Sequence, residues 1–112
     1  MVSNTEEVTT HFGYWPMFAD GEIVRLLFES PGFISLGIRY GDAKTKRAGV
    51  VHLRFSGVSG AQLNELREQT VLDALLVSDG RPIEVRLEAA YGVAGSFKCE
   101  SAAVVDFSKE TR

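Results

Sequence analysis

The chain has 112 residues, of which 45% are hydrophobic and 24% charged, and this composition excludes an intrinsically disordered protein. A net charge of −3 and a pI of about 5.3 argue against a nucleic-acid-binding domain, which usually carries a basic excess or a basic stripe. Cys99 is the single cysteine, so no internal disulfide can form, and no apolar stretch approaches the roughly 20 residues that span a bilayer. The N-terminus lacks the basic start and apolar run of a secretory signal, so we expect one soluble, cytosolic domain over residues 1–112 with no membrane partner.

Residues 4–12 are expected to form a short N-terminal helix. Ser3 or Asn4 has a side chain suited to the N-cap position, and Glu6 and Glu7 would lie in the first turn, where the helix dipole favours acids. The stretch "YWPMFADGE", residues 14–22, comes next and places three aromatic residues around a proline, followed by two carboxylates.

Six runs have the composition or the alternation of β-strands, namely residues 22–29, 33–40, 48–57, 71–80, 83–92 and 96–107. The alternation predicts one apolar face in each of three runs, formed by Ile34, Leu36, Ile38 and Tyr40, by Val51, Leu53 and Phe55, and by Ile83, Val85, Leu87 and Ala89. The last run is expected to place six residues on one face, namely Phe97, Cys99, Ser101, Ala103, Val105 and Phe107.

Two turn signals separate these runs. Pro31-Gly32 fits the central positions of a type II turn, and Asp79-Gly80 is a strong hairpin signal. Residues 60–70 instead favour helix, with Leu63 and Leu66 three apart on one face. Because most loops are too short for parallel crossovers, we expect an α+β fold, with a mainly antiparallel, curved or sandwich-like sheet of about six strands and one or two short helices.

Few residues are suited to catalysis or metal binding. Cys99 with His11 or His52 would supply a nucleophile and a base, but the alternation of its strand favours a buried, unreactive cysteine. Asp20 and Glu22 can hold Mg²⁺ or Ca²⁺ with water, although Asp followed by Gly is also an ordinary turn pair. A small metal-dependent or hydrolytic enzyme built on Asp20, Glu22 and one histidine stays an alternative, and no cofactor is implied.

Trp15 and Phe18 have two interpretations. Pro16 restricts Trp15 to an extended backbone and so stiffens the chain where the rings are placed. The rings can close one end of the core, or they can bind a partner, because tryptophan and tyrosine are common hot-spot residues at protein interfaces. The two roles are compatible.

Three segments resemble a bacterial immunity-protein family from polymorphic toxin systems, the immunity protein fifty family. The first is "FGYWPMFADGEIVRLLFE", residues 12–29, in which six residues match the opening motif of that family, namely Gly13, Trp15, Pro16, Phe18, Asp20 and Glu22. The others are "LRFSGV", residues 53–58, and "GVAGSFKCESAAVV", residues 92–105. Ala19 stands where the family has a histidine, which puts a His-Asp-x-Glu site in doubt.

The resemblance implies a non-enzymatic protein that binds and neutralises a bacterial toxin domain in the cytoplasm. The candidate contact residues are Trp15, Phe18, Asp20 and Glu22, followed by the acidic pairs Glu84/Glu88 and Glu65/Glu68. An acidic surface would suit a toxin that binds phosphate groups, such as a nuclease. A general protein-interaction module without a toxin partner is a further alternative.

Overall fold

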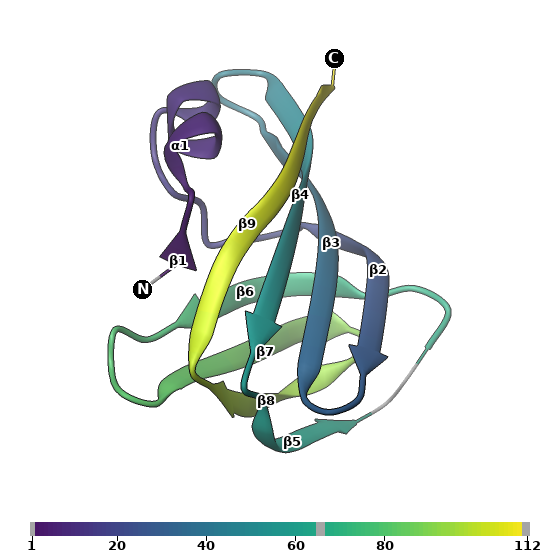
Figure 1. Ribbon diagram of the computed structural model, residues 1–112. Helices are drawn as coiled ribbons and strands as arrows, with labels where there is room; N and C mark the ends of the chain where they lie inside the picture. The colour runs from purple at the N-terminus through teal and green to yellow at the C-terminus, as the bar shows by residue number, and fades with distance from the viewer. Residues whose placement is uncertain (1, 65–66, 111–112) are drawn as a thin grey trace.

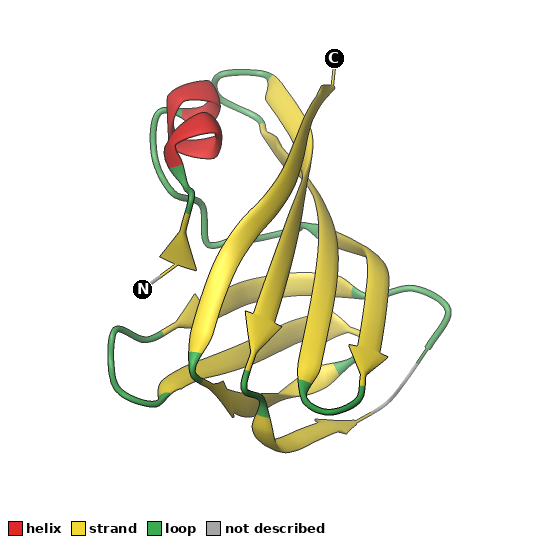
Figure 2. Cartoon of the chain, in the orientation of Figure 1, coloured by secondary structure: helices red, strands yellow, loops and turns green. Residues whose placement is uncertain are grey.

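The computed structural model describes residues 2–64 and 67–110. In chain order its elements are β1 (Val2–Ser3), α1 (Glu6–Phe12), β2 (Glu22–Glu29), β3 (Phe33–Asp42), β4 (Arg47–Ser56), β5 (Ser59–Asn64), β6 (Val71–Val77), β7 (Ile83–Tyr91), β8 (Ala94–Cys99) and β9 (Ser101–Glu110). The mainly β architecture with a short helix confirms the α+β prediction (Figure 2).

The strands form one sheet in the order β1-β9-β4-β3-β2-β6-β7-β8-β5, which folds over into two layers (Figure 1). One layer contains β9, β4, β3 and β2, and the other contains β6, β7, β8 and β5. Strands of the two layers cross steeply, as in orthogonal sheet packing. Among the strands that the structure describes, all pairs are antiparallel except β1 with β9, so the predicted, mainly antiparallel sheet is confirmed.

Within residues 2–64 and 67–110 the sheet has nine strands, so the prediction of about six was wrong. The chain turns from one layer into the other between β4 and β5, and back between β8 and β9. The two bends lie side by side, because the backbone N–H of Glu100 donates a 2.9 Å hydrogen bond to the carbonyl of Ser56. The predicted run 96–107 therefore spans two strands, β5 replaces a predicted helix, and β1 adds a short edge strand.

The core between the layers is formed by the predicted alternating faces. Buried side chains include Ile34, Leu36 and Ile38 from β3, Val51, Leu53 and Phe55 from β4, and Ile83, Val85 and Leu87 from β7. Tyr40 and Ala89, at the ends of two of these runs, are half-buried. The period-two pattern identified these faces because successive side chains of a strand point to opposite sides.

The prediction that alternate residues of 96–107 share one face was wrong beyond Cys99. The chain bends at Glu100, and the inward positions become Ala102 and Val104, one residue out of phase. The register then shifts again, since Leu53 pairs with Val104 while His52 pairs with Asp106. Val105 is the extra residue of this β-bulge and is 59% exposed. The bulge restores the original phase, so the ring of Phe107 packs against the core.

The helix predicted over residues 60–70 was also wrong. Ser59–Asn64 form β5, which pairs with β8, and residues 67–70 form no helix. Leu63 packs against the core from this strand, whereas Leu66 lies outside the described residues. Pairing with β8 prevails over local helix propensity, which is worth only tenths of a kcal/mol per residue.

The N-terminal helix is confirmed as α1, with Glu6 and Glu7 in its first turn. Its N-cap is Thr5, however, and not Ser3 or Asn4, and the Thr5 side chain makes no capping hydrogen bond. Along the described ranges 2–64 and 67–110, no helix has the length and apolarity needed to cross a membrane.

Both predicted turns are present in the structure, but each differs in detail from the prediction. The Ser30–Pro31 bond is cis, and the N–H of Gly32 donates to the carbonyl of Glu29, so proline takes the third turn position and not the second. Asp79-Gly80 does lie in the β6–β7 hairpin, but the loop covers residues 78–82. There the Ser78 hydroxyl accepts a 2.8 Å hydrogen bond from the N–H of Glu84.

Candidate functional site

Residues 14–21 cross one end of the molecule between α1 and β2. Gly13 ends the helix in a left-handed conformation (φ 86°), and its N–H donates to the carbonyl of Thr9. Tyr14 is then fixed by its hydroxyl, which lies 2.7 Å from the hydroxyl of Tyr40 and donates to Asp42 Oδ2 at 2.7 Å. The β3–β4 hairpin thereby holds the start of the aromatic stretch in place.

Phe18 closes this end of the core. Its side chain is 0% exposed, and its ring meets those of Trp15 and Tyr40 edge-on, with centroids 5.6 Å apart in both pairs. The backbone around it pairs with β6, because Leu75 N–H donates to the Met17 carbonyl at 2.8 Å. The prediction that Phe18 contacts a partner is incompatible with this burial, and the prediction of a core plug is confirmed for its ring.

Trp15 and Met17 border a groove beside this segment. The groove has a volume of about 390 Å³ and is lined by Val2, Thr5, Trp15, Pro16, Met17, Leu75, Leu76, Val77 and Asp79. Trp15 is half-buried and packs partly against the core, whereas Met17 is 55% exposed. We call this apolar surface the Trp15 groove. Met17 and part of Trp15 are accessible to a partner there.

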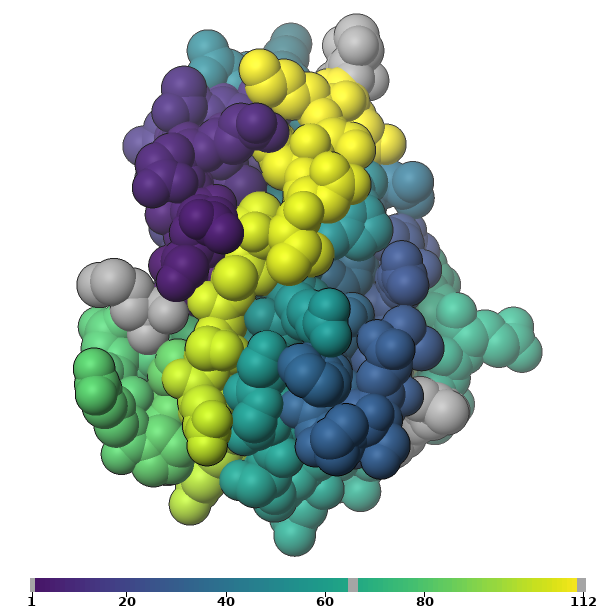
Figure 3. All heavy atoms as spheres, viewed as in Figure 1, coloured from purple at the N-terminus to yellow at the C-terminus, as the bar shows by residue number. Residues whose placement is uncertain are grey.

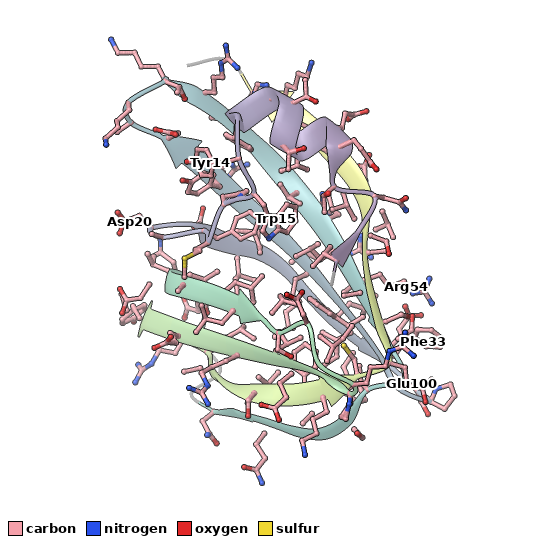
Figure 4. The ribbon with its side chains drawn as sticks, turned by 90° about the vertical axis from the view of Figure 1, so that its left-hand side faces the viewer. Tyr14, Trp15, Asp20, Phe33, Arg54 and Glu100 are labelled. Carbon is pink, nitrogen blue, oxygen red and sulfur yellow. The ribbon has the colours of Figure 1, made fainter. Side chains whose placement is uncertain are left out.

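Asp20 and Glu22 lie beside this segment but do not line the Trp15 groove. Asp20 is exposed at the tip of a turn with φ 63°, and its N–H donates to the carbonyl of Leu72 at 2.8 Å (Figure 4). Glu22 begins β2, and its carboxylate lies 3.5 Å from the guanidinium of Arg39. Both side chains are therefore accessible at the surface, and the turn interpretation of Asp20-Gly21 agrees with the structure.

The acidic residues of β7 lie on a different surface. Glu84 and Glu88 are exposed on the outer face of the second layer, with Arg86 between them. In the sheet register Glu84 is directly opposite Lys98 of β8. Glu68 is exposed as well, and Glu65 lies outside the described residues. The structure thus does not bring these acidic residues together with Trp15.

The residues considered for catalysis are dispersed. Cys99 is buried, and its burial raises the pKa of the thiol, which disfavours the reactive thiolate. His11 Nε2 lies 3.0 Å from the carbonyl of Ala48, while His52 lies on the outer face of β4. Within residues 2–64 and 67–110, no three His, Cys, Asp or Glu side chains are grouped so as to hold a metal ion.

Sequence reasoning missed most of the Trp15 groove. A lone methionine between aromatic residues carries no pattern, so nothing in the sequence marks Met17, and the composition of Leu75–Val77 indicates only a strand. Val2 also lines the groove, and its position depends on the pairing of β1 with β9, where Val2 lies opposite Ala102. A groove formed by three distant segments has no signal in the local sequence.

Comparisons with known proteins gave no match to a family model, to a curated protein or to a solved structure.

Proposed function

We propose that this protein is a non-enzymatic immunity protein that binds and neutralises a cognate bacterial toxin domain. The observation that carries the proposal is the Trp15 groove, an apolar surface in the segment that resembles the opening motif of the immunity protein fifty family. Buried Phe18 and the Tyr14–Asp42 hydrogen bond hold this segment rigidly, so little conformational entropy is lost when a partner binds.

The chemistry of the groove supports a protein ligand. Its lining combines an indole, a thioether and aliphatic side chains, the types that are enriched at the centre of protein interfaces. Asp20 and Glu22 lie outside the groove, where charged groups govern the rate and specificity of association more than affinity. We therefore assign Trp15 and Met17 as central contacts and Asp20 and Glu22 as peripheral ones.

The test is co-expression with the toxin domain encoded beside this protein, together with calorimetric titration of the two purified chains. We expect rescue of growth and tight one-to-one binding. Met17→Glu should weaken binding by about tenfold or more, because it places a charge in an apolar contact. It should leave the thermal midpoint unchanged, because Met17 is largely exposed.

Tyr91→Glu is the matched control. Tyr91 is 52% exposed and lies opposite Val71, at the far end of the β6–β7 pair from the groove. Full binding by both variants would remove the Trp15 groove from the interface. Toxicity without rescue by the wild-type protein would contradict the proposed function itself.

A further inference from the structure

The outer face of β2, β3, β4 and β9, turned towards the viewer in Figure 3, carries a second hollow, of about 360 Å³. Its lining includes Arg25, Glu29, Ser35, His52, Arg54 and Asp106. We call it the sheet-face hollow. It lies on the opposite side of this layer from the core and shares no lining residue with the Trp15 groove.

The strand register explains why this face is hollow. Arg25, Gly37, His52 and Asp106 form one row across the four strands, and Leu27, Ser35 and Arg54 form the next. In these two rows the central strand β3 places only Gly37 and Ser35 on the outer face, whereas β2 and β4 place longer side chains there. The result is a floor of small residues between walls of larger ones.

His52 depends on the small floor. A Cβ atom at Gly37 would lie 2.9 Å from His52 Cε1 and 3.2 Å from the Cβ of Arg25. The imidazole thus lies over Gly37, on the side of the sheet from which the Arg25 side chain also starts.

The arginines of the hollow have no carboxylate partner among the described residues. Glu22 and Glu110 pair with Arg39 instead, at 3.5 Å and 3.4 Å from its guanidinium. Arg54 instead lies over the ring of Phe33, 4.3 Å from its centroid (Figure 4). The guanidinium of Arg25 makes no hydrogen bond or ion pair with any residue in 2–64 or 67–110.

Two carboxylates flank the hollow. Asp106 lies on the outermost strand of the row, beside His52, and Glu29 lies at the end of β2. The hollow is therefore lined by two arginines, a histidine and the hydroxyl of Ser35, with a carboxylate at each margin.

We propose that the sheet-face hollow receives the carboxylate of an acidic side chain of a partner protein, one flanked in the partner by basic residues. Arginine matches a carboxylate with two parallel N–H donors, and such charge-assisted hydrogen bonds are the stronger ones. Ser35 and His52 supply further donors, while Asp106 and Glu29 attract the flanking basic groups. That the partner is a toxin rests on the proposed function. That the hollow binds a carboxylate is argued independently of that function.

The test is an NMR titration of the ¹⁵N-labelled protein with a blocked pentapeptide that has a central glutamate between two lysines. We expect shift changes centred on Ser35, Gly37 and His52, with much smaller changes for a peptide that has glutamine at the centre. The double variant Arg25→Gln/Arg54→Gln should weaken peptide binding by about tenfold or more. Arg86→Gln is the control, because Arg86 is exposed on the outer face of the other layer.

Inorganic phosphate is titrated in parallel to separate a partner site from a site for a free anion. Phosphate binding without peptide binding, shift changes elsewhere on the surface, or equal affinity of the double variant would each overturn the proposal. The titration needs no toxin, so failure of growth rescue and failure of this inference are distinguishable.

Discussion

The hydroxyl of Tyr14 donates a 2.7 Å hydrogen bond to Oδ2 of Asp42, which lies 28 positions further along the chain. The other oxygen of the same carboxylate accepts a 2.8 Å hydrogen bond from the N–H of Lys44. One carboxylate thus fixes both the start of the aromatic stretch and the turn between β3 and β4. Tyr14 is thereby held at the entrance to the segment that we assign to partner binding.

The first prediction concerns the pH dependence of this contact. The hydrogen bond from Tyr14, followed by that from Lys44, lowers the pKa of Asp42 from its ordinary value of 3.8. A carboxyl group with a lower pKa in the folded state stabilises the fold above its unfolded pKa, and this contribution is lost as pH falls through the folded pKa. The thermal midpoint of the wild-type protein should therefore fall more steeply below about pH 4 than that of Asp42→Asn. Parallel pH profiles of the two proteins would contradict this assignment.

The second prediction separates the core role of Phe18 from the surface role of Trp15. Phe18→Ala should lower the free energy of unfolding by about 3–5 kcal/mol, because it leaves a cavity at the end of the core. Trp15→Ala should lower the free energy of unfolding by less, because the Trp15 side chain is only half-buried. It should have the larger effect on toxin binding. Urea denaturation of both variants checks the order of the two stabilities.

The third prediction concerns Asp20 and Glu22. The double variant Asp20→Asn/Glu22→Gln should change the free energy of unfolding by less than about 1 kcal/mol, because the Glu22–Arg39 pair is solvent-exposed and asparagine tolerates the positive φ at position 20. Calorimetry should show weaker toxin binding, whereas Glu84→Gln/Glu88→Gln should retain full affinity. Unchanged affinity of the first variant would remove both carboxylates from the interface.

The fourth prediction tests the β-bulge in β9. Deletion of Val105 would place Val104, Asp106 and Phe107 in regular in-out-in alternation opposite β4, so Phe107 would stay on the core side. The protein should fold with a similar thermal midpoint. Deletion of Arg54 from the regular part of β4 should prevent folding, because it moves Phe55 to the outer face. Circular dichroism of the two deletion variants provides the comparison.

The fifth prediction concerns the β5–β8 pair. Gly95 has φ 149°, and a Cβ atom there would overlap the carbonyl oxygen of Gln62. Gly95→Ala should therefore cost about 2 kcal/mol or more, through backbone strain and overlap together. Gly60→Ala is the control, because Gly60 also has a positive φ but has no heavy atom within 4 Å of the added Cβ. If urea denaturation shows the same loss of unfolding free energy for both variants, overlap with the Gln62 carbonyl of β5 is unimportant.

The aromatic stretch illustrates how far sequence reasoning reached into the candidate site. Asp20-Gly21 correctly indicated a turn, and the stiffness expected from Pro16 stays a prediction. The burial of Phe18 and the exposure of Met17 were not predictable, because both depend on which side of the segment faces β6. The grouping of Val2 with Leu76 in the Trp15 groove depends likewise on how distant strands pair.

The sequence by itself determined the local features of this protein: the alternating faces of β3, β4 and β7, the short helix α1 and the position of the β6–β7 hairpin. These depend on side-chain periodicity and turn chemistry within a few residues. The tertiary structure alone decided that Ser59–Asn64 is a strand, that the chain bends at Glu100 and that Val105 forms a bulge. Each of these follows from pairing with a strand far away in the chain, and the energy of such pairing exceeds the small local preferences that a sequence displays.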